Sequence, residues 1–153
     1  MSGFGYGVTA GYTGLDTNVL LRYILRDDAD QYAAAEAVFT SLTRECPGFI
    51  TQVTLAEMYW VLSRSMKFSR AECLAVISKL VHAREFEFDD GESVVRALTL
   101  AEAGADFGDA LIQGTMELFG VGRVVTFDRA AAQRLGWELL EASRNSSEPG
   151  ALE

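Results

Sequence analysis

The sequence has few of the residues from which several common kinds of site are built. Cysteine occurs only at positions 46 and 73, with no C-x-x-C or Cys/His spacing, so neither a zinc knuckle nor a disulfide framework is expected. His82 is the only histidine and is expected to be an ordinary surface residue. A single histidine excludes multi-histidine metal centres, and its expected surface position argues against Ser-His-Asp and Cys-His catalysis.

Basic residues are also scarce. Lys and Arg total 13 against 22 Asp and Glu, which gives a formal net charge of -9 and a sequence pI near 4.6. This balance argues against a protein that holds nucleic acid on a broad basic face, although a locally basic groove stays open. Because no long apolar run and no signal-peptide pattern is found, we expect no membrane association and a cytoplasmic location.

The length and composition indicate one domain. A chain of 153 residues, 49% of them hydrophobic, buries about two-thirds of its unfolded surface without disulfides or structural metal. Residues 1–13 contain four glycines and no charge, and we interpret them as a flexible arm, a tag remnant or an irregular approach to a first strand. The domain is predicted to span 14–142, and the polar residues 143–153 are predicted to form a frayed tail.

Short apolar strands alternate with helical patterns along the chain. Strands are predicted to end at Gly14 and to span 49–53, 86–88, 123–127 and 137–140; helices are predicted over 19–26, 31–44, 54–65, 69–84, 92–103, from 110 to about 119, and over 129–135. Such alternation predicts an α/β fold with a mostly parallel central sheet that helices cover on both faces.

Acidic residues occur where predicted strands lead into helices. Asp16, Glu57 and Asp128 each follow a strand, and Asp106 and Asp109 open the helix that begins near residue 110. Because the carboxyl ends of parallel strands meet at one edge of a sheet, these carboxylates are predicted to form one cluster there.

Each acid also has a simpler interpretation as a helix cap. Asp is a preferred N-cap residue, and acids in a first helical turn complement the helix dipole. The segment Thr54-Leu55-Ala56-Glu57 matches the S/T-x-x-E capping box, and Asp109 occupies the corresponding place after Asp106. Convergence of several such acids favours a functional role, since a cap does not need to lie near other caps.

Clustered carboxylates repel one another, and a divalent cation relieves that repulsion. Oxygen-only ligands favour Mg²⁺ or Mn²⁺ over zinc or copper. Two such ions would hold an attacking water and a leaving oxygen in line across a phosphodiester. Phosphoryl-transfer hydrolysis is therefore the reaction class that the acids fit best.

Four segments together resemble the PIN-domain nucleases, and among them the VapC-type ribonuclease toxins of toxin–antitoxin pairs. The segments are GLDTNVLL at 14–21, TLAEMYWVL at 54–62, DFGDALI at 106–112 and VTFD at 125–128. They stand in the family's order, and the resemblance covers about 14–140. It implies a three-layer α/β/α sandwich, a metal-dependent endoribonuclease activity on RNA, a cognate VapB-like antitoxin and a homodimer.

The resemblance also implies roles for individual residues. Asp16 and Asp109 would be the principal ligands of Mg²⁺ or Mn²⁺, with two ions expected, and Glu57 and Asp128 would complete the acidic site. Asp106 is a fifth site acid, an outer group or the cap of its helix; a supporting role is favoured. Thr17, Asn18 and Thr126 either orient ligands and waters or serve only turns and caps.

Other residues are candidates for contact with substrate or partner. Arg22 and Arg26, four residues apart after Asp16, either reach a phosphate or form a solvated helix face; Arg64, Lys67 and Arg70 form a second basic candidate for an RNA backbone or an acidic partner segment. The aromatic residues Tyr23, Tyr59 and Trp60 either stack on bases or belong to the core or an interface. An antitoxin helix in an apolar groove is one mode of partner recognition.

Two other functions remain as alternatives. One is an acid-pocket, Mg-dependent phosphatase or phosphotransfer domain with Asp16 as nucleophile, although Asp16-Thr17-Asn18 lacks a second aspartate two positions on. The other is a non-catalytic PIN-like module that keeps its acids only as caps. Trapping of phosphate on Asp16 would favour the first alternative.

Overall fold

The structure, a computed structural model, describes residues 11–143. Most of the predicted arm (1–13) and of the predicted tail (143–153) therefore lies outside the described residues. In order, the elements are β1 (Thr13–Gly14), α1 (Thr17–Leu25), α2 (Ala29–Ser41), β2 (Gly48–Ile50), α3 (Gln52–Trp60), the π-helical turn η1 (Val61–Ser65), α4 (Arg70–His82), β3 (Phe86–Phe88), α5 (Gly91–Glu102), α6 (Phe107–Leu118), β4 (Val125–Thr126), α7 (Arg129–Leu135) and β5 (Glu138–Leu139).

The first three strands form a parallel sheet in the order β1-β2-β3. Gly48 of β2 lies opposite Thr13 on one side and Phe86 on the other. The predicted α/β class and the parallel pairing are thus confirmed. The predicted start of the domain at residue 14 is too far along the chain. Thr13 already pairs in β1, and the Tyr12 ring stacks on that of Phe49 with the ring centres 6.3 Å apart.

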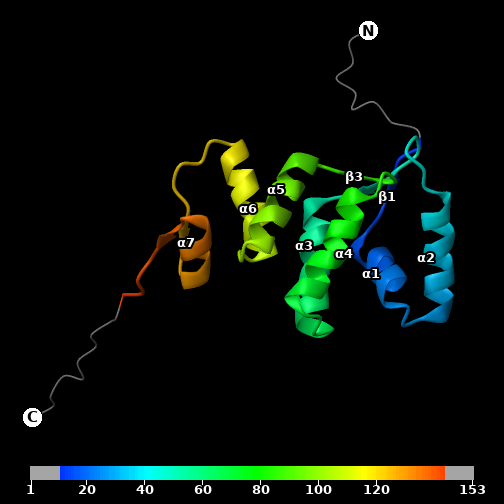
Figure 1. The fold of residues 1–153 in the computed structure, drawn as a ribbon, viewed down its shortest axis with the longest axis horizontal. Helices are drawn as coiled ribbons and strands as arrows, with labels where there is room; N and C mark the ends of the chain where they lie inside the picture. The colour runs from blue at the N-terminus through cyan, green and yellow to red at the C-terminus, as the bar shows by residue number, and fades with distance from the viewer. Residues whose placement is uncertain (1–10, 144–153) are drawn as a thin grey trace, which may run out of the picture.

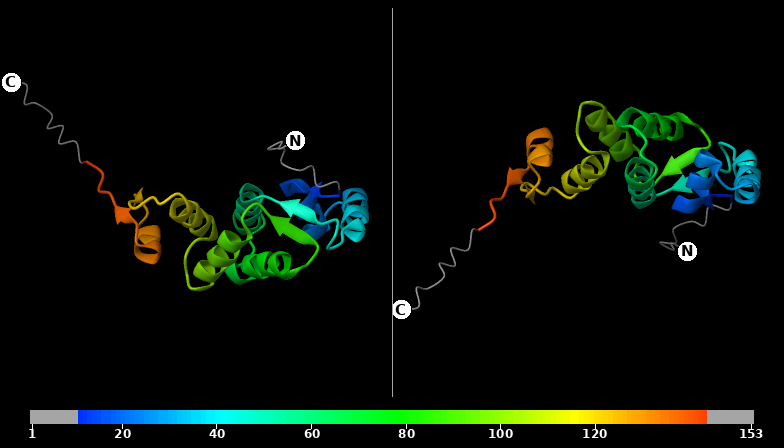
Figure 2. Two further views of the ribbon diagram at one scale, coloured as in Figure 1. Left: turned by 90° about the horizontal axis from the view of Figure 1, so that it is seen from above. Right: turned by 90° about the horizontal axis from the view of Figure 1, so that it is seen from below.

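Helices lie on two sides of this sheet. In Figures 1 and 2 the strands lie between the α1–α2 pair and the group α3, α4 and α5. Ile50, Leu55, Ile77 and Phe107 are fully buried between them, which places the core along β2, α3, α4 and α6. None of the helices in residues 11–143 combines the length and apolar character needed to cross a bilayer.

The last two strands form a separate sheet. β4 and β5 pair in parallel with each other, Val125 opposite Glu138, and with no other strand of residues 11–143. With α7 they lie at the far end of the molecule from α2, beyond α6 (Figures 1 and 2). The expectation of one central sheet is therefore wrong for these strands, and the strand predicted over 123–127 is only Val125–Thr126.

Both sheets have an open edge. The amides of Thr13 and Leu15 donate to the carbonyl oxygens of Pro47 and Phe49. The amide and carbonyl of Gly14, which lies between them, therefore point away from β2. In β4, Val124 and Thr126 accept from Glu138 and Leu140, and the Val125 amide points away from β5. Phe127, directly after β4, is 69% exposed. These edges are places where each sheet can accept another strand.

Hydrogen exchange tests this division of the strands. We expect the amides of Gly14 and Val125 to exchange faster than that of Leu15, which donates to Phe49 O at 3.0 Å. Backbone amide exchange resolved by NMR provides the measurement. Protection of both Gly14 and Val125 at the level of Leu15 would mean that β1 and β4 pair in solution.

Candidate functional site

A groove opens between the start of α1 and the second half of α3. Its volume is about 560 Å³. It contains two of the four predicted site acids, together with the neighbouring polar residues of α1 and apolar residues from both helices. The lining residues are Asp16, Thr17, Asn18, Leu21, Ala56, Glu57, Trp60 and Val61. The parallel pairing of β1 with β2 creates this groove, since both strands run into their helices at the same edge.

Asp16 stands between β1 and α1. Its Oδ1 accepts a hydrogen bond from the Val19 amide at 3.0 Å, so it is the N-cap of α1, as a simple cap interpretation predicts. Within residues 11–143 no hydrogen bond reaches its Oδ2, and the side chain is exposed at the groove. The N-cap hydrogen bond fixes Oδ1 of Asp16 and leaves Oδ2 available for another contact.

Glu57 lies deeper in its helix than the capping-box interpretation predicts. The N-cap of α3 is Thr51, whose Oγ1 accepts from the Thr54 amide at 3.1 Å. The Thr54–Glu57 box is therefore wrong: the strand ends at Ile50, three residues before the predicted end at Val53. Glu57 is beyond the first turn, so a helix cap does not explain an acid at this position.

Thr17 connects the two groove acids. Its hydroxyl donates to Glu57 Oε2 at 2.7 Å, across 40 positions of sequence. Thr17 directly follows Asp16, so this bond holds Glu57 close to the Asp16 junction. Of the two interpretations of Thr17, orientation of a carboxylate or service only in a turn, the contact supports the first.

A second set of acids lies at the starts of α6 and α7. Asp106 is the N-cap of α6, its Oδ2 accepting from the Asp109 amide at 3.0 Å, and Asp128 is the N-cap of α7. Burial raises the pKa of Asp109, and the negative charges of Asp106 and Asp128 raise it further. The Thr126 hydroxyl accepts from the Asp128 amide at 2.9 Å, so it stabilises the turn into α7.

The two sets do not form one cluster. Among residues 11–143 no three Asp, Glu, His or Cys side chains lie together as a metal-holding group. The predicted single carboxylate cluster is therefore absent from this arrangement, because β4 pairs only with β5 and Asp128 ends a different sheet from Asp16. A four-acid, two-ion centre does not fit these positions. The donor chemistry of Asp16 and Glu57 does suit one hard cation, since Mg²⁺ commonly takes one or two carboxylates and completes its shell with water.

The predicted basic candidates near the groove have partners within the protein. Arg22 donates to Gln31 Oε1 at 2.6 Å and pairs with Asp27 at 2.8 Å. The Arg26 guanidinium lies 4.9 Å from the centre of the Tyr32 ring, beyond the C-terminal end of α1.

The second basic candidate is also partly engaged. Arg70 donates to the carbonyl oxygens of Ala101 and Ala105 and so fastens α4 to the α5–α6 connection. Arg64 and Lys67 are exposed. We find that the structure explains Arg70 by packing rather than by substrate contact.

The aromatic candidates separate into core and surface. Tyr59 is buried and its ring lies 5.4 Å from that of Phe107, while Tyr23 stacks on Phe39 at 4.2 Å. Trp60 is 60% exposed and lines the groove. Sequence reasoning did not select the apolar groove residues Leu21 and Val61. For Val61 the spacing signals the shared face, since it lies four positions after Glu57.

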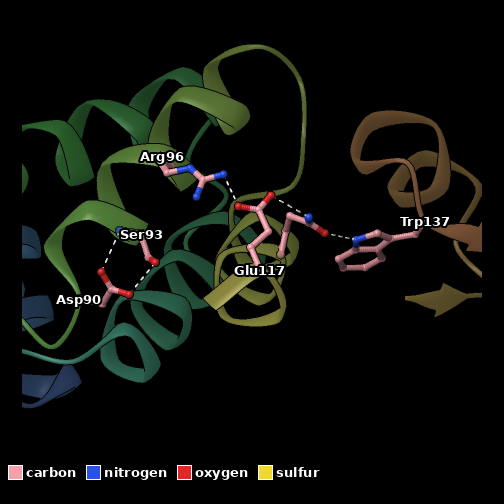
Figure 3. A network of polar contacts seen from close by, with 6 residues as sticks. Asp90, Ser93, Arg96, Glu117 and Trp137 are labelled. Atoms are coloured by element: carbon pink, nitrogen blue, oxygen red, sulfur yellow. Dashed lines mark hydrogen bonds and ion pairs between the residues drawn. The ribbon is translucent and has the colours of Figure 1, made fainter. Parts of the chain in front are cut away.

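A chain of polar contacts attaches the C-terminal elements to α6 (Figure 3). Trp137 Nε1 donates to Gln113 Oε1 at 2.5 Å, Gln113 Nε2 donates to Glu117 Oε1 at 2.9 Å, and Glu117 pairs with Arg96 of α5. Nearer the start of α5, Asp90 accepts from the Ser93 amide and hydroxyl. Side-chain hydrogen bonds thus link the C-terminal elements to α6 and α5.

The raised pKa of Asp109 predicts a pH dependence of stability. The pKa of this carboxyl is higher in the folded protein than in the unfolded chain. Its ionisation therefore lowers the free energy of unfolding as the pH rises from the unfolded pKa through the folded pKa. Asp109→Asn removes this effect, so the variant should have a higher free energy of unfolding than wild type at pH 7. The two proteins should converge near pH 3.

Denaturant unfolding across that pH range provides the measurement. Glu36→Gln is the matched control, because it makes the same change in charge on the exposed surface of α2. A stability difference between Asp109→Asn and wild type that does not change with pH would contradict the assignment.

Comparison with known proteins agrees with the motif order. Residues 14–137, about four-fifths of the chain, match the family model described as PIN domain. No curated protein matches the chain. No solved structure matches it either.

Proposed function

The chain belongs to the PIN domain family, and on that premise we propose that it is a metal-dependent endoribonuclease of the VapC type. PIN domains are generally magnesium-dependent nucleases. The observation that carries the proposal is the groove that holds Asp16 and Glu57, joined through Thr17. We further propose a cytoplasmic RNA substrate, a VapB-like antitoxin and a homodimer, all of which rest on the motif resemblance.

Asp16 and Glu57 are the residues that would hold Mg²⁺ or Mn²⁺ in the groove. A bound ion would supply charge neutralisation for a phosphodiester and activation of water. The protein positions the two carboxylates: the N-cap hydrogen bond of α1 fixes one Asp16 oxygen, and the Thr17 hydroxyl fixes one Glu57 oxygen. Asn18 lies on the same groove and is proposed to orient substrate or water.

We propose that Asp109 and Asp128 serve the same reaction with a second ion, and that Asp106 supports Asp109. This part of the proposal requires the second acidic set to approach the first. The open edges of β1 and β4 offer a route: parallel pairing of Gly14 with Val125, which the metal-free protein is expected to lack, would bring Asp128 to the end of the sheet where Asp16 lies.

Cleavage of labelled RNA tests the proposal. We expect hydrolysis with Mg²⁺ or Mn²⁺ and none with EDTA. Asp16→Asn and Glu57→Gln should each reduce the rate at least about 100-fold, the upper end of what loss of an outer-shell partner costs. Thr17→Val should cost about 10–100-fold, and Thr17→Ser should restore the rate because it keeps the hydroxyl.

Further variants separate the parts of the proposal. Asp109→Asn and Asp128→Asn should also lose activity if both sets serve one reaction, whereas full activity of both would restrict catalysis to the groove. Glu36→Gln, on the exposed surface of α2, is the control. Metal-independent cleavage, or undiminished activity of Asp16→Asn, contradicts the nuclease mechanism; phosphate release from a phosphomonoester with trapping on Asp16 favours the phosphatase.

A further inference from the structure

Trp60 is a large apolar side chain left exposed beside the groove acids. It is the last residue of α3, three positions after Glu57, and so lies on the same helical face. Its side chain is 60% exposed, whereas the adjacent Tyr59 is buried. An exposed indole at the acids of a groove is a feature that packing of the core does not explain.

Apolar side chains surround Trp60 and form a patch within the groove. Leu21, Ala56 and Val61 line the groove together with the indole. The π-helical turn η1 begins directly after Trp60, and the Val61 amide bonds to both Glu57 O and Met58 O. Such π-turns within helices occur frequently at functional sites.

The side chains that line this groove bring no positive charge to a polyanion. The chain carries a net charge of -9, and the ionisable side chains that line the groove are the acids Asp16 and Glu57. Arg22 is bound to Asp27 and Gln31, and Arg26 lies against Tyr32. Besides its phosphate, which a bound metal ion would neutralise, a substrate gains affinity on the apolar part of this lining through an uncharged part of its own structure.

A nucleobase has that property, because it is planar, uncharged and able to stack on an aromatic ring. We propose that Trp60 stacks on an unpaired base of the RNA, next to the phosphate that lies at Asp16 and Glu57. The inference rests on the proposed function and deepens it: Trp60 holds the base next to the cut site. Paired bases, already stacked within a duplex, cannot lie on the indole.

Abasic substitution in the RNA tests the contact directly. The substrate is a short single-stranded RNA with one cut site, in versions that each lack one base near the cut. For wild type, removal of one particular base should lower kcat/KM about 10-fold to 100-fold. For Trp60→Leu, which keeps apolar bulk without a ring, the intact RNA should already show that loss, mainly in KM, and removal of the same base should cost almost nothing more.

Matched variants keep the result interpretable. Trp60→Phe retains a ring and should stay within a few-fold of wild type. Phe119→Leu, at a ring 76% exposed just after α6, should behave as wild type. Thermal unfolding of Trp60→Leu should match wild type, because the side chain is exposed.

If Trp60→Leu and base removal lower kcat/KM additively, the inference is overturned. Metal-dependent cleavage by wild type would still support the proposed nuclease activity in that case. Equal cleavage of RNA by Trp60→Leu and wild type would overturn the inference too and would point to a protein segment as the occupant of the patch. Absence of metal-dependent cleavage by wild type would instead overturn the proposed function on which the inference rests.

Discussion

The parallel pairing of β1 with β2 is the constraint on which the candidate site depends. Because Thr13 lies opposite Gly48 and both strands run the same way, α1 and α3 begin at the same edge of the sheet. Asp16 and Glu57 are 41 positions apart in sequence, yet the hydrogen bond from Thr17 joins their two helices at 2.7 Å. The groove, its acids and the exposed Trp60 all follow from this pairing.

The acidic character of the chain has two physical sources. Several aspartates start helices, as Asp28, Asp90 and Asp106 show by accepting amides of the first turn. Asp109 is in a different position, because burial and the negative charges of Asp106 and Asp128 raise its pKa. A divalent ion suits such positions, since its charge stabilises the ionised carboxylate that a neighbouring acid destabilises.

Local patterns in the sequence predicted the acids near the groove better than they predicted how the strands assemble. Asp16 follows from a strand-to-helix junction. Glu57 was selected as an acid in the first turn after a strand, but β2 ends at Ile50 and Thr51 caps α3, so Glu57 lies beyond that turn. The capping-box pattern at Thr54–Glu57 pointed to the wrong cap, and only the true end of β2 identifies Thr51.

The arrangement of the strands depends on distant contacts. The pattern around Val125 correctly indicates a strand, but a two-residue strand carries no information about its partner, and β4 pairs with β5 rather than β1. In the same way, sequence could not distinguish Tyr59 from Trp60. Adjacent helical residues point about 100° apart, and the packing of Phe107 buries the first and leaves the second in the groove.

The central claim is that the groove between α1 and α3 is the metal-binding site for RNA hydrolysis. Diffraction from crystals soaked in Mn²⁺, recorded for its anomalous signal, tests this claim most directly. We predict an anomalous peak within about 2.0–2.3 Å of carboxylate oxygens of Asp16 and Glu57. A peak found only at Asp106, Asp109 and Asp128, or no peak at any of these acids, would contradict the account.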